Sequence, residues 1–196
     1  MVFHSNCFVL SAYHVLAWAK QGIVGRGVLV DFATYASRNN LSYDPLGHYA
    51  ISLSTFHEIA QESKITFQPG DIILLRTGFT AAFESASLST KQAIFAQSPF
   101  QYPGLESSLQ TLKFLWNSQF AAVAGDCPGF EAWPPAEQAM HQTLLSGFGM
   151  PIGELFDLED LAKECEKQQR WTFFFTSQVL NVKGGVASPP NAIAIF

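Results

Sequence analysis

The sequence predicts one α/β domain, and three observations support this fold class. Helix-like and strand-like apolar patterns alternate along the chain, as they do in proteins that pack helices on a sheet. No internal repeat and no linker interrupts the alternation, which favours a single domain over residues 1–196. A chain of 196 residues, of which 48% are apolar, is long enough to bury a sizeable core.

Short apolar runs predict the strands of the sheet. Runs of this length, bounded by Gly, Pro and polar residues, are typical of buried strands. In "GIVGRGVLVDF" (22–32), Gly25 and Gly27 leave room for a close backbone approach. The other runs are "DIILLRT" (71–77), "FAAVAGD" (120–126), "WTFFFTS" (171–177) and "NAIAIF" (191–196), and one more surrounds Glu154.

Amphipathic patterns and capping signals predict the helices between these strands. A capping box, Ser54-Thr55-x-x-Glu58, begins one helix, and Asp157 caps another that runs to about Lys167. Pro134 and Pro135 suit the first turn of a helix that runs to about Ser146. Further helices are expected at 8–19 and 105–117, whereas 37–50 is expected to be loop and 80–103 irregular with one short helix.

Charge and composition argue against several classes of partner. A net charge of −5 without a Lys/Arg run argues against nucleic acid, and no apolar stretch is long enough to predict a membrane span. Cys7, Cys127 and Cys165 form no CxxC pair, which indicates free thiols in a reducing, cytoplasmic compartment. The first 20 residues are interpreted as a buried helix and not as a signal peptide.

The apolar content also predicts a partner chain. Only 14% of the residues are charged and 18 are Phe, which leaves little charge with which to cover a free surface. Apolar surface is therefore expected to be buried against another chain, or against sequence absent here. A homo-oligomer is the expectation.

The candidate functional residues stand where apolar runs end in polar side chains. Glu154 lies inside the apolar run 150–156, where an ionised carboxylate is costly to desolvate unless a cation or donor receives it. His141 precedes it across a Gly-rich bend and is the candidate to meet it. Asp126 and Arg76 end two predicted strands, at the place where sites of α/β proteins usually form.

Each of these residues also has a structural interpretation. Glu154 alone is explained by an ion pair with Arg76 or Arg170, and His141 by a satisfied position in the core or on the surface. Asp126 suits a helix cap or an Asx-turn, and Arg76 suits a tie between carboxylates at the end of the sheet. Cys127 is a weak nucleophile candidate because no histidine lies near it in sequence. The residues alone indicate a His/Glu metal or acid–base site on an α/β domain.

Five ordered segments carry a family resemblance. They are "GIVGRGVLVDF" (22–32), "FQPGDIILLRTGF" (67–79), "FAAVAGDCPGFEAWPP" (120–135), "MHQTLLSGFGMPIGELFDLEDLAKEC" (140–165) and "RWTFFFTSQVLNVKGGVASPPNAIAIF" (170–196). From Gly22 onward the chain resembles the cyclase family of metal-dependent hydrolases, which includes bacterial kynurenine formamidase and isatin hydrolase, and it looks closest to the fungal branch. The resemblance implies a mixed central sheet with flanking helices. It also implies that His141 and Glu154 are active-site residues at a divalent metal, Zn or Mn, for which imidazole and carboxylate are suitable ligands.

The family signature H-x-G-T-H-x-D-x-x-x-H does not occur in this sequence. His4 is followed four positions later by Phe8, and His14 by Trp18, where a second histidine is needed. Catalytic zinc sites usually have three protein ligands and one open position. The chain is therefore expected either to lack its N-terminal part, to be a paralogue that has lost the metal and the chemistry, or to receive the missing ligands from a partner chain.

By resemblance the function is hydrolysis of a C–N bond in a small amide, formamide or lactam, in specialised metabolism. Arg76, Asp126 and Trp133 are the candidates for contact with this small-molecule substrate, and Phe79 and Phe130 join Trp133 as candidates for an aromatic pocket. The alternative is a catalytically silent or truncated paralogue that acts as a binding or scaffold subunit.

Overall fold

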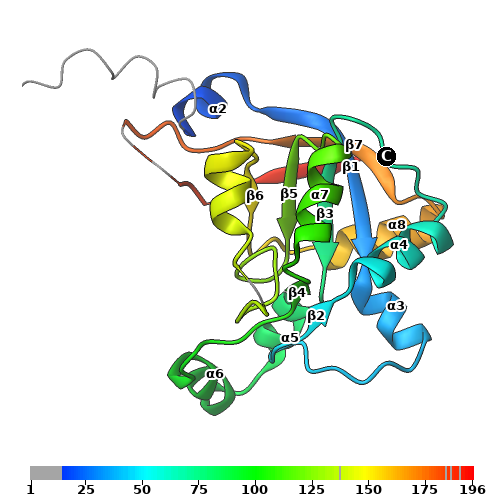
Figure 1. Ribbon diagram of the computed structural model, residues 1–196, viewed down its shortest axis with the longest axis vertical. Helices are drawn as coiled ribbons and strands as arrows, with labels where there is room; N and C mark the ends of the chain where they lie inside the picture. The colour runs from blue at the N-terminus through cyan, green and yellow to red at the C-terminus, as the bar shows by residue number, and fades with distance from the viewer. Residues whose placement is uncertain (1–14, 137, 184, 186, 190) are drawn as a thin grey trace, which may run out of the picture.

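The computed structural model describes residues 15–136, 138–183, 185, 187–189 and 191–196. It confirms the predicted fold class, a single α/β domain with a six-stranded mixed sheet and flanking helices (Figure 1). His4, Cys7, His14 and most of the helix expected at 8–19 lie outside the described residues. The described part of that segment forms α2 (Val15–Gln21).

The sheet has the strand order β6-β5-β3-β1-β7-β8, and every predicted strand occurs within a few residues of its expected bounds. Neighbours among β1, β3, β5 and β6 pair in parallel, and β7 pairs antiparallel with both β1 and β8. The carboxyl ends of the four parallel strands therefore lie at one edge of the sheet. The strands are β1 (Ile23–Asp31), β3 (Ile72–Arg76), β5 (Ala122–Gly125), β6 (Ile152–Gly153), β7 (Thr172–Ser177) and β8 (Ala192–Ile195).

One face of the sheet carries the larger core. The helices α3 (Phe32–Arg38), α4 (Leu53–Glu62) and α7 (Leu109–Asn117) contribute to it, and α7 lies in front of the sheet in Figure 1. A small parallel sheet of β2 (Ala50–Ile51) and β4 (Gly104–Leu105) adds Ile51 and Leu105. In this core, strand side chains pack against helix side chains: Val28, Val30, Ile73, Leu75 and Val123 of the strands, and Phe56, Ile59 and Leu115 of the helices. Full burial of one such side chain stabilises the folded state by about 1.5–3 kcal/mol.

The opposite face packs against α8 (Glu159–Gln168). Leu158, Ala162 and Cys165 belong to one buried cluster with Leu29, Leu74 and Phe173 of the strands. A Cβ added at Gly27 would collide with the Phe173 ring. The space predicted at Gly27 is therefore filled by an aromatic ring and not by another backbone.

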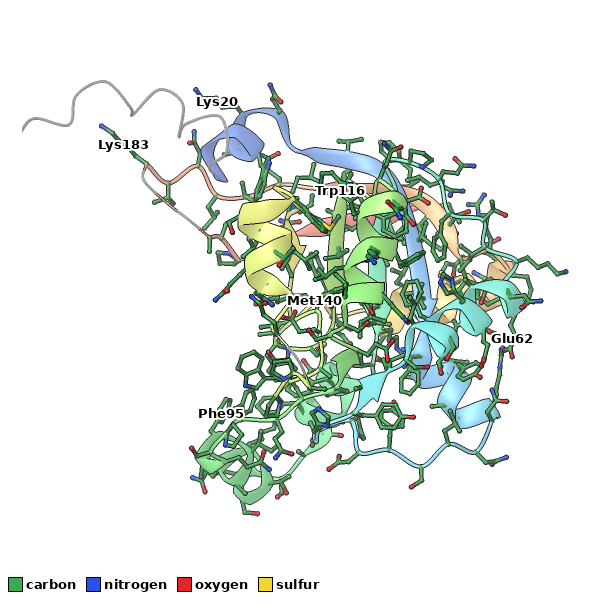
Figure 2. The ribbon with its side chains drawn as sticks, viewed as in Figure 1. Lys20, Glu62, Phe95, Trp116, Met140 and Lys183 are labelled. Carbon is green, nitrogen blue, oxygen red and sulfur yellow. The ribbon has the colours of Figure 1, made fainter. Side chains whose placement is uncertain are left out.

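The segment expected to be irregular with one short helix instead forms two helices, α5 (Phe79–Ser85) and α6 (Leu88–Ala96). The Ser87 hydroxyl caps α6 by accepting a hydrogen bond from the Thr90 amide at 3.1 Å. Figures 1 and 2 show α6 at the lower end of the molecule, with Phe95 on it, and this side chain is 70% exposed.

The prediction of a helix from Pro134 to about Ser146 is wrong over the first half of that range. Trp133 exchanges two backbone hydrogen bonds with Tyr102, and Leu105 bonds the backbone on both sides of Glu131, so this stretch is held against β4. That pairing outweighs the local Pro signal. The chain becomes helical only at His141 and continues as a π-helical turn, η1 (Thr143–Gly147).

Two further helix starts differ from the prediction. α3 was not expected, and the Asp31 carboxylate caps it by accepting a hydrogen bond from the Thr34 amide at 3.0 Å. α4 is capped by Ser52 and not by Ser54, and Glu58 accepts a hydrogen bond from the Tyr35 hydroxyl instead of closing a capping box. Across the described residues, no helix combines the length and the apolar character that a bilayer span needs.

Candidate functional site

His141 and Glu154 meet in the structure, as the sequence predicts. Nε2 of His141 lies 2.9 Å from Oε1 of Glu154. His141 begins the short helix that continues as η1, and it follows Met140, which is fully buried and labelled in Figure 2. Glu154 directly follows β6. Both side chains are partly accessible, at 32% and 39%.

The backbone around Glu154 leaves it little freedom. A Cβ added at Gly153 would collide with the Phe156 ring and lie 2.9 Å from Cβ of Ala124. Leu155 has a φ of 56°, and its amide donates to the Cys127 carbonyl at 3.1 Å. The chain therefore turns sharply after β6, and this turn places the Glu154 carboxylate beside His141.

A second carboxylate, Glu131, holds the other side of His141. Its Oε2 lies 2.7 Å from Nδ1 of His141, and its Oε1 accepts a hydrogen bond from the His141 amide at 3.0 Å. The Glu131 side chain is fully buried. Glu131 was not predicted from the sequence, although an acidic side chain in the apolar stretch "CPGFEAW" is the same kind of signal that marked Glu154.

The two carboxylates change the protonation of the imidazole. Their hydrogen bonds, first that of Glu131 and then that of Glu154, raise the pKa of His141 to about 10. Burial is the largest single influence on Glu131 and raises its pKa, but the hydrogen bonds from His141 and from the backbone, together with the charge of His141, hold that pKa below its usual value. Without a metal, the three groups form a carboxylate–imidazolium–carboxylate arrangement at neutral pH.

A cavity of about 440 Å³ opens beside this pair. His141 and Glu154 lie on its wall together with Ser177 and Ser188. The rest of the wall is mainly apolar and includes side chains from the sheet face that α8 packs against: Ile23, Ile72, Ala122, Ala124 and Phe175. A polar pair at the wall of an apolar cavity is typical of a small-molecule site.

The structure does not bring Arg76 to this cavity. Its guanidinium bonds Glu159 at 2.9 and 2.7 Å and Asp31 at 2.8 Å, which ties β3 to α8 and β1. The interpretation of Arg76 as a tie between carboxylates is confirmed. The alternative of an ion pair between Arg76 and Glu154 is wrong. The Arg76 guanidinium is occupied by the carboxylates of Glu159 and Asp31, and Glu154 instead bonds His141.

Asp126 and Trp133 also lie apart from the cavity wall. The buried Asp126 carboxylate accepts hydrogen bonds from the Thr77 amide and hydroxyl and from the Gly78 amide, each at 2.7 Å. It therefore holds the loop after β3 rather than capping a helix. Trp133 packs against a small cluster that contains Phe79, and Phe130 is fully buried in the larger core. Substrate contact by Arg76, Asp126 and Trp133 stays a prediction.

Cys127 is fully buried, and burial raises the pKa of its thiol well above the usual value. Its Sγ donates to the Gly129 carbonyl at 2.8 Å. A thiol that stays protonated and inaccessible is not a nucleophile, which agrees with the sequence interpretation.

The donor atoms at His141 and Glu154 suit a divalent metal as part of a ligand set. Imidazole nitrogen and carboxylate oxygen are ligands of zinc, and metal-ligating histidines usually donate their other ring nitrogen to a carboxylate, as His141 does to Glu131. Within the described ranges, no group of three or more His, Cys, Asp and Glu side chains is placed to hold a metal. These residues therefore supply two ligands and one supporting carboxylate.

Comparison with known families assigns the chain through a segment that ends before His141 and Glu154. The profile of the family described as "Putative cyclase" matches residues 5–132, well over half of the chain. The chain belongs to the cyclase family. No protein of curated function matches it.

Solved structures of similar fold include members of the same family. A protein described as a novel cyclase is 28% identical, with a TM-score of 0.79 over 93% of this chain and 56% of the other. Isatin hydrolase A from Ralstonia solanacearum is 17% identical, with a TM-score of 0.65 over 92% of this chain and 63% of the other. A protein described as a "potential metal-dependent hydrolase with cyclase activity" is 18% identical, with a TM-score of 0.53 over 88% and 65%.

The alignments cover a larger share of this chain than of the solved structures. This cyclase-family chain is matched over 88–93% of its residues, but it spans only 56–65% of the lengths of the proteins it resembles. The two structures below 25% identity establish the shared fold alone.

Proposed function

We propose that this chain provides part of a metal-dependent hydrolase site that acts on a C–N bond of a small amide, formamide or lactam. The observation that carries the proposal is the 2.9 Å approach of His141 Nε2 and Glu154 Oε1 on the wall of an apolar cavity. The similarity to isatin hydrolase and to a protein described as a metal-dependent hydrolase supports it.

The chain's own residues would act by binding and orientation. His141 and Glu154 would hold a divalent Zn or Mn ion, which supplies carbonyl polarisation and water activation when bound. Glu131 keeps the imidazole in place through two hydrogen bonds. The apolar wall formed by Ile72, Ala122 and Phe175 would take the apolar body of the substrate and keep water away from it.

A second candidate function is a catalytically silent binding or scaffold subunit. The specific observation in its favour is that the described residues bring together only two candidate metal ligands. A catalytic zinc ion usually has three ligands from the protein. In this case the cavity would bind a small apolar molecule without turning it over.

A hydrolysis assay separates the two candidates. The full chain would be incubated with N-formylaniline and with isatin, as formamide and lactam probes, in the presence of Zn²⁺ or Mn²⁺. We expect turnover of at least one probe by the wild-type chain, and its loss in Glu154→Gln but not in Glu58→Gln, which alters a carboxylate bonded to Tyr35 on another part of the surface. Saturable binding of the probes without any turnover would favour the silent subunit.

A further inference from the structure

We propose that Glu131 is a positioning residue that fixes the ring orientation and tautomer of His141, so that only Nε2 faces the cavity as a ligand atom. The inference rests on the proposed metal site and deepens it. Glu131 itself is not proposed to touch metal or substrate. Both of its oxygens are occupied by donors from His141.

The hydrogen-bond chemistry assigns the tautomer. An ionised carboxylate only accepts hydrogen bonds, so an Nδ1 at 2.7 Å from Oε2 carries the proton. The backbone amide of the same residue donates to Oε1 at 3.0 Å, and these two contacts fix the ring relative to its own main chain. In the metal-free imidazolium, Nε2 carries a second proton, which faces Glu154. Because Nδ1 stays bonded to Glu131, Nε2 is the ring nitrogen that would lose its proton and take a cation beside Glu154.

The backbone that carries Glu131 is itself fixed. The Leu105 amide donates to the Phe130 carbonyl at 3.0 Å, and the Ala132 amide donates to the Leu105 carbonyl at 2.9 Å. A Cβ added at Gly104 would lie 2.6 Å from the Ala132 amide nitrogen, so the two segments are in close contact. Glu131 therefore stands between two backbone bonds on an ordered element, as an orienting residue requires.

Burial makes the pairing specific. The Glu131 side chain is fully buried, and a buried carboxylate is stable only when donors compensate its desolvation. The donors that the structure gives it both belong to His141. The bond from Oε2 to the ring nitrogen is therefore additional to the backbone bond, and it is the contact that orients the imidazole.

The test compares metal affinity and ring tautomer in the full chain. The variants are Glu131→Gln and Glu131→Asp, with Asp71→Asn as the matched control, because Asp71 is also a buried carboxylate but bonds Arg26 and the Gln68 amide instead of His141. Zn²⁺ affinity is measured by competition with a chelator, and ¹⁵N chemical shifts of the His141 ring in the Zn²⁺-loaded chain report which ring nitrogen keeps its proton. Cooperative unfolding in urea confirms that each variant is folded.

We expect Glu131→Gln to weaken Zn²⁺ binding by about 10–100-fold, the usual effect of losing a supporting carboxylate. A glutamine has one acceptor oxygen for two donors, so a fraction of the rings in the Zn²⁺-loaded variant should keep the proton on Nε2 instead of Nδ1. Glu131→Asp keeps the charge but is one methylene shorter, and it should lie between Gln and wild type. Asp71→Asn should leave affinity and tautomer unchanged even if it lowers stability.

Three results would overturn the proposal. A Glu131→Gln variant with wild-type affinity and an Nδ1-protonated ring would remove the positioning role while leaving the metal site intact. Equal losses of affinity in Glu131→Gln and Asp71→Asn would assign the effect to general destabilisation. A wild-type chain that binds no Zn²⁺ would refute the proposed function, and the ligand-positioning role with it, and the wild-type measurement alone identifies that outcome.

Discussion

At the scale of single residues, Gly153 sets the geometry of the candidate site. It lies between Phe156 and Ala124 so closely that a side chain has no room, and the next residue is Glu154. The backbone angles of Gly153 do not exclude another residue type; the lack of space for a Cβ does. The turn that places Glu154 beside His141 therefore requires a residue without a side chain at position 153.

We expect Gly153→Ala to lower the free energy of unfolding by about 1–3 kcal/mol, the usual range for overpacking a tight contact. It should also displace Glu154 and weaken metal binding. Urea unfolding and metal titration would measure the two effects. Gly147→Ala is the control, because its added Cβ would make only an ordinary contact with Thr143 at 3.6 Å. Equal stability of Gly153→Ala and wild type would contradict the account.

Two of the three carboxylate and imidazole groups at the site could be predicted from sequence. Glu154 was marked by an apolar run on both sides, and the family resemblance paired it with His141. Glu131 has a comparable apolar context, but its partner is the residue that was already matched to Glu154, and no spacing rule shows that one imidazole bonds two carboxylates. That arrangement depends on tertiary contacts of the segment with β4.

At the scale of elements, Arg76 connects three parts of the fold. Its guanidinium joins the end of β3 to Asp31 at the end of β1 and to Glu159 at the start of α8. The ion pair is largely shielded, with Arg76 at 14% and Asp31 at 7% side-chain exposure. Removing the cation would leave a nearly buried carboxylate unpaired.

We expect Arg76→Ala to lower the free energy of unfolding by about 3–5 kcal/mol, as breaking a buried pair usually does. Metal binding at His141 and Glu154 should be unchanged at temperatures where the variant stays folded. Chemical unfolding and metal titration test this, with Arg38→Ala as a control, because its pair with Glu166 is exposed. A stable Arg76→Ala chain with weakened affinity for substrate would instead support the substrate contact predicted from sequence.

Strands were easier to predict than helices because each strand is a short apolar run with clear ends. The helix expected from Pro134 shows why helices were harder. The proline signal is local, whereas the bonds that keep Trp133 and Ala132 extended come from Tyr102 and Leu105, about thirty residues earlier in the sequence. Over residues 80–103 the sequence predicts one short helix where two occur, because the Ser87 cap of α6 lies in a stretch rich in Ser and Gln that resembles a loop.

At the scale of the whole molecule, an apolar patch lies on the antiparallel side of the sheet. We define it by Val24, Phe174, Ile193 and Ile195, which are 59%, 50%, 58% and 53% exposed. The strand pairing places them on one face of β1, β7 and β8, because Phe174 is opposite Ile195 and Arg26, and Thr176 is opposite Ile193 and Val24. We propose that a second copy of the chain covers this patch, which would give the homo-oligomer expected from the composition.

Replacing two patch residues, in Phe174→Lys/Ile195→Lys, should therefore dissociate the oligomer into monomers. Sedimentation velocity of the wild-type and variant chains at equal concentration measures the change. Leu88→Lys is the control, because Leu88 is 72% exposed on α6, apart from the patch. A wild-type chain that is already monomeric at tens of micromolar would refute the proposed interface.

We propose that His141 and Glu154 bind a divalent metal, and the metal content of the purified chain decides whether they do. The full chain would be purified without chelators and analysed by elemental analysis, beside His141→Ala, Glu154→Ala and His57→Ala, in which the altered histidine lies exposed on α4. We predict close to one equivalent of Zn or Mn in the wild-type chain and in His57→Ala, and its loss in the other two variants. A wild-type chain without metal, or variants at His141 and Glu154 that keep it, would contradict the account.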